Sequence, residues 1–276
     1  MRNTVTVGYK SIDQSKKYRL IREERNQLQG IKNDNRFELD IELKHLEKDI
    51  FSISILNYKQ ANVSGFFQWT NELYKLRKYV IIQMGSDGKL DSILNLPEIQ
   101  NEWEAIRGSI LRNHLQDKHA KGIASEVTML LEDKERFENS LRHTAPYNIF
   151  FSGIHNSNYN YDEINFGSRV IPNFIGVKSL PIITEEKLIA SASSQKGQLE
   201  LKVNGELDKD LFDQNLMTDF VKTLKNRPRV VSQLKLKYTE KFKFDSDHWP
   251  IQYLNMSLAM VPMFLYREEK VILKEI

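Results

Sequence analysis

The residues of this chain that could do chemistry are few, and one group of them lies in a single polar segment. Ser152, His155 and Asp162 supply the residue types of a hydrolase triad, in which a histidine takes the proton of a nucleophilic hydroxyl. Triads are defined by their geometry in space, so three polar residues of one Asn-rich segment are more simply loop residues. A hydrolase that uses His155 or His248 is therefore an alternative rather than the main interpretation.

A second polar group, Asp245, Asp247 and His248, could bind a divalent cation if further oxygen ligands came from elsewhere. Asp and Ser are also ordinary turn formers, and the other ligands of a calcium loop are missing, which favours a turn between two strands. His114 and His119 are five residues apart, whereas metal-binding helices use an i, i+4 pair. The sequence has neither a phosphate-binding glycine loop nor a His-Glu-x-x-His motif. We therefore expect no metal, no cofactor and no catalytic residue.

The strongest surface signal is a cationic strand near the end of the chain. Lysines alternate there with apolar residues, at positions Lys235, Lys237, Lys241 and Lys243. Residues two apart on a strand lie ~6.5–7 Å from each other, so these lysines could engage phosphates, anionic lipid headgroups or an acidic protein surface. The patch would be widened by four upstream cations, Lys222, Lys225, Arg227 and Arg229. The plainer alternative is a solvated sheet face, or lysines that prevent edge-to-edge aggregation.

A second candidate for partner binding is the segment 144–168, which is rich in Asn and Tyr and has no regular period. Long irregular segments in compact proteins are commonly functional loops or linkers. Aromatic and amide side chains suit recognition, so the candidate residues are His155, Asn158, Tyr159 and Tyr161.

Most elements around these residues have the period of half-buried strands. Residues 37–44 and 51–55 alternate as a hairpin, and Asp87-Gly88 is a turn between two apolar runs within 79–94. Residues 230–244 alternate as well, and the Met-rich strand 251–260 is expected to be covered on both faces.

Helices are predicted at four places. One covers 66–76, one begins with a capping box at Asn95, one runs from Gly122 to before Pro146, and one is capped by Asp208 or Asp210. The predicted fold class is α+β, a mostly antiparallel sheet with helices packed on it. The similar order of elements in the two halves leaves open an arrangement as two similar lobes.

The expected domains are a hairpin and helix lobe at 1–143, a connecting loop at 144–168 and an α+β lobe at 169–276. The chain has no cysteine, which excludes disulfides and thiolate chemistry. The first residues have no apolar run typical of a secretory signal, so we expect a soluble, cytoplasmic protein without a membrane span. A net charge of +3, from 40 basic and 37 acidic residues, is close to balance and does not point to nucleic acid.

These patterns favour a non-enzymatic protein that binds another macromolecule, as a subunit of a larger assembly. Another protein is the favoured partner, ahead of an anionic surface, and nucleic acid is disfavoured because no aromatic RNA-binding motif accompanies the lysines. The alternative is a carrier that holds an apolar ligand or lipid between the sheet and a helix. Its cavity would be lined by Met256, Leu258, Met260 and Phe264, since methionine adapts to varied apolar surfaces.

Overall fold

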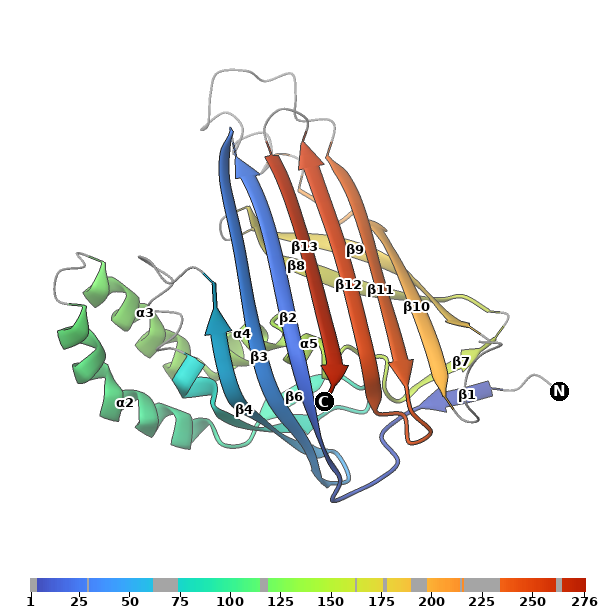
Figure 1. The fold of residues 1–276 in the computed structure, drawn as a ribbon, viewed down its shortest axis with the longest axis horizontal. Helices are drawn as coiled ribbons and strands as arrows, with labels where there is room; N and C mark the ends of the chain where they lie inside the picture. Colours follow the sequence, from blue (N-terminus) through green and yellow to red (C-terminus); the bar gives the residue numbers. More distant parts are fainter. Residues whose placement is uncertain are drawn as a thin grey trace. The chain divides into compact units, whose positions relative to one another are not determined.

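A computed structural model of the chain describes residues 4–28, 30–61, 74–114, 119–161, 163–175, 178–189, 198–213, 215, 234–261 and 265–276. Eleven strands form one sheet in the order β6-β5-β4-β3-β2-β13-β12-β11-β10-β9-β8, and β1 (Thr4–Val7) pairs with β7 (Ser157–Asn160) in a second sheet (Figure 1). The mostly antiparallel sheet is therefore confirmed. The prediction of an α+β fold is only partly correct, because the described part of the chain is largely sheet rather than a balance of helix and sheet.

Two strands are longer than the apolar alternation of the sequence indicates. β2 (Ser15–Leu28) and β3 (Ile31–Glu47) have 14 and 17 residues, although much of each is charged. Their charged side chains pair with one another on the same face, as Arg36 does with Glu23 and Glu38 at 3.2 and 2.8 Å. Cross-strand pairs of opposite charge support a sheet without apolar alternation, so the apolar pattern underestimates the strand.

The chain forms two compact units. The first contains residues 1–7, 20–38 and 158–275, and the second contains residues 8–19, 39–157 and 276. One change of unit, between Ser157 and Asn158, falls inside the segment 144–168. That segment includes α5 (Tyr147–Phe150), β7 and the beginning of β8 (Asn165–Ile175).

The second unit is built around the two hairpins that the sequence predicted. β3 and β4 (Ile50–Gln60) are neighbours in the sheet, as expected for residues 37–44 and 51–55, and β5 (Tyr79–Met84) pairs with β6 (Leu90–Ile93) around the predicted turn, where Gly88 has a φ of +72°. β4 also pairs with β5, which was not predicted. A Cβ at Gly88 would lie 1.9 Å from the carbonyl oxygen of His155, so both the backbone angle and the space require glycine there.

The longer helices described in this unit are α2 (Leu96–Asn113), α3 (Ala120–Glu132) and α4 (Lys134–Arg142), and α2 and α3 lie side by side (Figure 1). The predicted capping box at Asn95 is wrong. Its side chain accepts a hydrogen bond from the Ile81 amide and donates one to the Tyr79 carbonyl, and so joins the helix start to β5. The helix predicted from Gly122 is two helices, since Asp133 ends α3 and its carboxylate caps α4 by accepting from the Arg136 amide at 3.0 Å.

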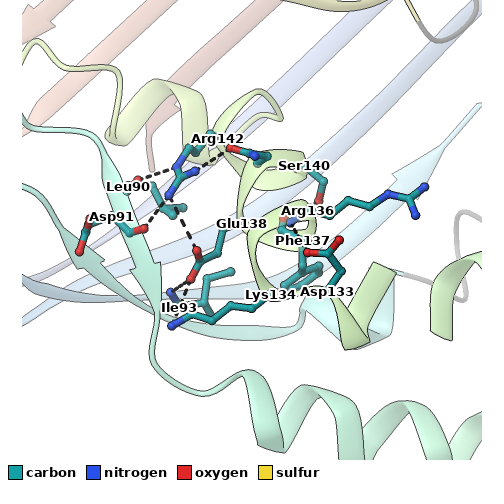
Figure 2. Close-up of polar contacts among 11 residues, drawn as sticks. Leu90, Asp91, Ile93, Asp133, Lys134, Arg136, Phe137, Glu138, Ser140 and Arg142 are labelled. Atoms are coloured by element: carbon teal, nitrogen blue, oxygen red, sulfur yellow. Dashed lines mark hydrogen bonds and ion pairs between the residues drawn. The ribbon is translucent and has the colours of Figure 1, made fainter. Parts of the chain in front are cut away.

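One buried carboxylate fixes α4 to the sheet (Figure 2). Glu138 is 6% exposed and accepts a hydrogen bond of 2.9 Å from the amide of Ile93 in β6. Lys134 and Arg142 lie 3.7 and 3.8 Å from the same carboxylate, and Arg142 also donates to the carbonyls of Leu90 and Asp91. These charges and hydrogen bonds compensate the burial of the carboxylate.

We expect Glu138→Ala to destabilise the protein by about 1–3 kcal/mol, because the Ile93 amide would be left buried without an acceptor. Glu138→Gln keeps an oxygen at the same place and should lose less. Chemical denaturation of both variants gives the comparison. Equal losses would show that the ion pairs, and not the hydrogen bond to Ile93, hold α4 in place.

The first unit contains the long strands of the C-terminal half. They are β8, β9 (Lys178–Ile189), β10 (Leu199–Leu207), β11 (Lys235–Phe244), β12 (Pro250–Val261) and β13 (Leu265–Glu275). Their residues alternate between two faces. The buried face includes Leu201, Phe242 and Tyr253, which are neighbours across β10, β11 and β12, and we call the opposite face of β9–β13 the outer face.

Several predicted features lie outside the described residues. These are most of the helix 66–76, of which only η1 (Tyr74–Arg77) is described, the helix after Asp208, and Asp162, Lys222, Lys225, Arg227, Arg229 and Phe264. Asp208 does cap a turn, as its carboxylate accepts from the amides of Asp210 and Leu211.

Candidate functional site

The predicted alternation of the cationic strand is confirmed by the burial of β11. Lys235, Lys237 and Lys241 are exposed and Lys243 is half-buried, whereas Tyr238, Phe242 and Phe244 are buried on the opposite face. The lysines thus lie on the outer face, where they are accessible to another molecule.

The strand register extends this cationic group across two more strands. Lys202 of β10 lies directly opposite Lys241 of β11 on one side and directly opposite Lys187 of β9 on the other. We call Lys187, Lys202 and Lys241 the lysine row, and all three are exposed on the outer face. Like charges at directly opposite positions destabilise a sheet, so repulsion within the lysine row destabilises the folded state. An anionic partner bound between the lysines could restore this stability.

Only part of this charge is compensated within the described residues. Lys241 makes an ion pair of 2.8 Å with Glu200 of β10, which lies two residues from Lys202 and directly opposite Lys243. Among the residues that the structure describes, no ion pair is found for Lys187, Lys202, Lys235, Lys237 or Lys243. The outer face therefore presents five lysine charges that no described carboxylate pairs with.

An apolar strip runs beside the lysines of β11. Its members alternate along β12 on the outer face: Leu254, Met256, Leu258 and Met260. Met256 is 47% exposed and the other three are half-buried, so the prediction that this strand is covered on both faces is wrong. The buried side of β12 is instead taken by Tyr253, Asn255, Ser257, Ala259 and Val261. Met256, Leu258 and Met260, predicted to line a carrier's cavity, thus lie on the partly exposed face.

The four candidate residues of the segment 144–168 do not form one exposed surface. His155 and Tyr159 are each 1% exposed. The ring of His155 stacks on that of Tyr9 at 4.0 Å, and the Tyr159 hydroxyl donates to Glu186 at 2.8 Å. Asn158 is exposed but accepts from the Thr6 hydroxyl in the sheet of β1 and β7, and Tyr161 is half-buried. Only Asn158 and Tyr161 are accessible to a partner.

A buried ionic network lies on the face opposite the lysine row. Arg169 of β8 donates to Glu186 of β9 at 3.0 Å and lies 3.5 Å from Glu240 of β11. Hydroxyls of Tyr159 and Tyr238 donate to Glu186 and Glu240, respectively. One guanidinium thus lies beside two buried carboxylates, and a tyrosine hydroxyl donates a hydrogen bond to each of them.

Burial shifts the ionisation of this network. It raises the pKa of Tyr238 and Tyr253 well above the usual value, and the charge of Glu240 raises both further. The pKa of Arg169 is also raised: burial lowers it, but the charges of Glu240 and Glu186 outweigh that effect. The two phenols remain neutral and Arg169 remains charged, which suits an internal structural network rather than proton transfer.

The surroundings of His248 are those of a turn between two strands. Asp245 and His248 form the predicted turn between β11 and β12, where the carboxylate accepts from the amides of Asp247 and Trp249 and His248 has a φ of 63°. His45, which the sequence did not single out, is also buried, and its ring nitrogens lie 2.8 and 3.0 Å from the backbone carbonyls of Ser11 and Lys48. Over the described ranges, no group of three or more His, Cys, Asp or Glu residues could hold a metal ion.

None of the helices within the described residues is both long and apolar enough to cross a membrane.

Two features of these strands, one on each face of the sheet, were missed from the sequence alone. Lys187 and Lys202 lie on separate strands, and only the register places them in line with Lys241. Glu240 was missed on the buried face, although strict alternation from Tyr238 to Phe242 would have placed it there.

Comparison with known proteins adds little to this description. No protein-family model matches the chain, and no curated protein matches it either. Among solved structures, one described as lipid–protein interactions in lipovitellin is similar to this chain, with a TM-score of 0.46 and 8% sequence identity. The match covers 97% of this chain and 25% of that one. The chain thus spans about a quarter of the lipovitellin chain, and a likeness this weak identifies no ligand.

Proposed function

We propose that the chain is a non-enzymatic protein that binds an acidic partner protein on the outer face of β9–β12, as a subunit of a larger assembly. The observation that carries the proposal is the lysine row, because three like charges at opposed positions of neighbouring strands oppose folding. Carboxylates of a partner placed between these lysines would relieve the repulsion on binding.

The distribution of charge on this face favours a protein over a uniformly anionic surface. Glu185 of β9 and Glu206 of β10 are exposed on the same face as the lysines. A lipid bilayer or a nucleic-acid backbone presents only negative charge there and would meet these carboxylates unfavourably. A protein can place its own charges residue by residue, so it can satisfy both signs.

Chemical modification of lysine amines tests the binding surface. The full chain is acetylated once in pure form and once in its native cell extract after nuclease treatment, and the modification of each lysine is measured by mass spectrometry. We expect Lys187, Lys202, Lys235 and Lys237 to react less in the extract, because a partner covers them.

The exposed lysines Lys44, Lys78 and Lys121 of the second unit provide the internal control and should react equally in both samples. If Lys187, Lys202, Lys235 and Lys237 react as much in the extract as they do in the pure chain, the proposal is contradicted. Protection that is found only in a parallel extract without nuclease treatment would assign the surface to nucleic acid instead.

A further inference from the structure

We infer that the segment docking on this surface is an acidic amphipathic helix of the partner protein, whose apolar side lies along the strip Leu254, Met256, Leu258 and Met260. The inference rests on the proposed function and specifies the partner's chemistry. It follows from the position of the strip between charged strands, from its length and from the hydrogen-bonding needs of any chain laid on a sheet face.

The strip is bordered by lysines on both sides. On β11, Lys241, Lys237 and Lys235 lie directly opposite Leu254, Leu258 and Met260, respectively. On β13, Lys270 lies directly opposite Met256. A ligand seated on the strip therefore meets apolar groups at its centre and ammonium groups at its margins.

The one carboxylate that borders the strip is already engaged. Glu268 of β13 lies opposite Leu258, but it pairs with Arg25 at 3.4 Å and accepts from the Tyr266 hydroxyl at 2.9 Å. Its charge is compensated within the chain, so the margins of the strip present net positive charge. An apolar ligand with acidic flanks is the complement of this pattern.

Backbone hydrogen bonding favours a helix over an extended peptide. Every peptide N–H and C=O that is removed from water needs a partner, and an α-helix supplies these partners within itself. A single strand laid on the face of a sheet would leave its backbone groups unpaired against apolar side chains. A helix with apolar residues at i, i+3, i+4 and i+7 presents the single apolar side that the strip can accept.

The length of the strip sets the size of the helix. Leu254 and Met260 are six residues apart on β12, which corresponds to ~20 Å on a strand. A helix that covers this distance needs ~13 residues, or between three and four turns. Methionine suits such a surface because its unbranched thioether adapts to the side chains of a docked helix.

Photo-crosslinking from the centre of the strip tests the inference. The full chain carries a benzoylphenylalanine in place of Met256, is irradiated in its native cell extract, and the residue to which it is joined is mapped by mass spectrometry. A second form with the same group in place of Leu56, a residue of the second unit that is 50% exposed, is the control. We expect an adduct from position 256 only, on a helical segment with apolar residues at i, i+3, i+4 and Asp or Glu beside them.

A peptide of the mapped segment gives a second readout. Its affinity for the unmodified chain should fall at least ~10-fold when its carboxylates are changed to amides, because the lysine margins would lose their counter-charges. An adduct with lipid or nucleic acid, an adduct with a segment that lacks this pattern, or no adduct beyond that of position 56 would each overturn the inference. If the lysines remain protected in the extract while position 256 gives no adduct, the proposed function stands and only the helix is wrong.

Discussion

Replacing Arg169 by methionine is expected to lower the free energy of unfolding by about 3–5 kcal/mol. The variant keeps the apolar stem but removes the guanidinium that lies 3.0 Å from Glu186 and 3.5 Å from Glu240. Those carboxylates are 7% and 4% exposed, so they would remain in the interior without a counter-charge. Urea unfolding followed by tryptophan fluorescence measures the loss.

A compensated variant separates charge from packing. Adding Glu186→Gln and Glu240→Gln to Arg169→Met removes all three charges while oxygens remain for the hydroxyls of Tyr159 and Tyr238. Since an uncompensated charge costs more than a neutral polar group, the triple variant should recover much of the lost stability. A loss below about 1 kcal/mol in Arg169→Met alone would mean that water reaches the carboxylates and that the network is not buried.

The second large effect is expected in alkali, through Tyr9, Tyr238 and Tyr253. Burial raises the pKa of all three phenols well above the usual value, and Glu240 raises those of Tyr238 and Tyr253 further. In the unfolded chain each phenol ionises near pH ~10, while in the folded chain it stays neutral. The unfolded state therefore binds fewer protons above pH ~10, and stability that is complete below this pH is lost as the pH rises.

Each of the three phenols should remove about 1.4 kcal/mol of stability by pH ~11, or about 4 kcal/mol together. Urea unfolding at a series of alkaline pH values measures the slope. Tyr253→Phe is the matched variant, because its hydroxyl lies 3.4 Å from Glu240 and contributes little else, and its slope should be smaller by one phenol. If ultraviolet titration shows all 11 tyrosines ionising near the usual pKa while the protein is still folded, the assignment is wrong.

The part of the surface that could be predicted from sequence is the part encoded within one strand. The alternation of Lys235, Lys237 and Lys241 with Tyr238 and its neighbours is local, and the structure confirms it. The turn at Gly88 was predictable for the same reason, since its dipeptide specifies a positive φ.

Features that need the pairing of distant strands could not be predicted. Lys187, Lys202 and Lys241 lie opposite one another only because β9, β10 and β11 pair in one register. Nothing in a single sequence fixes that register. Arg169 was missed for a related reason: a charged residue is expected outside unless its partners are known, and they lie on other strands.

Local composition also misrepresented the segment 144–168. Its Asn and Tyr residues suggested an exposed recognition loop. Tyr159 is instead buried, with its hydroxyl donating a hydrogen bond to Glu186, and His155 is buried with its ring stacked on Tyr9. Aromatic residues with a polar end suit both situations, so their type does not distinguish a recognition loop from a packed segment.

The central claim, that the outer face of β9–β12 binds an acidic protein, is tested most directly by reversing charge on the lysine row. Lys187→Glu, Lys202→Glu and Lys241→Glu are combined in one chain, and Lys44→Glu, Lys78→Glu and Lys121→Glu in another, so that both variants change the net charge equally. The proteins recovered with each tagged variant from native extract, at native abundance, are then quantified against those of the unchanged chain. The account predicts that the first variant folds but loses its specific partner, while the second retains it; equal retention of that partner by both variants would contradict the account.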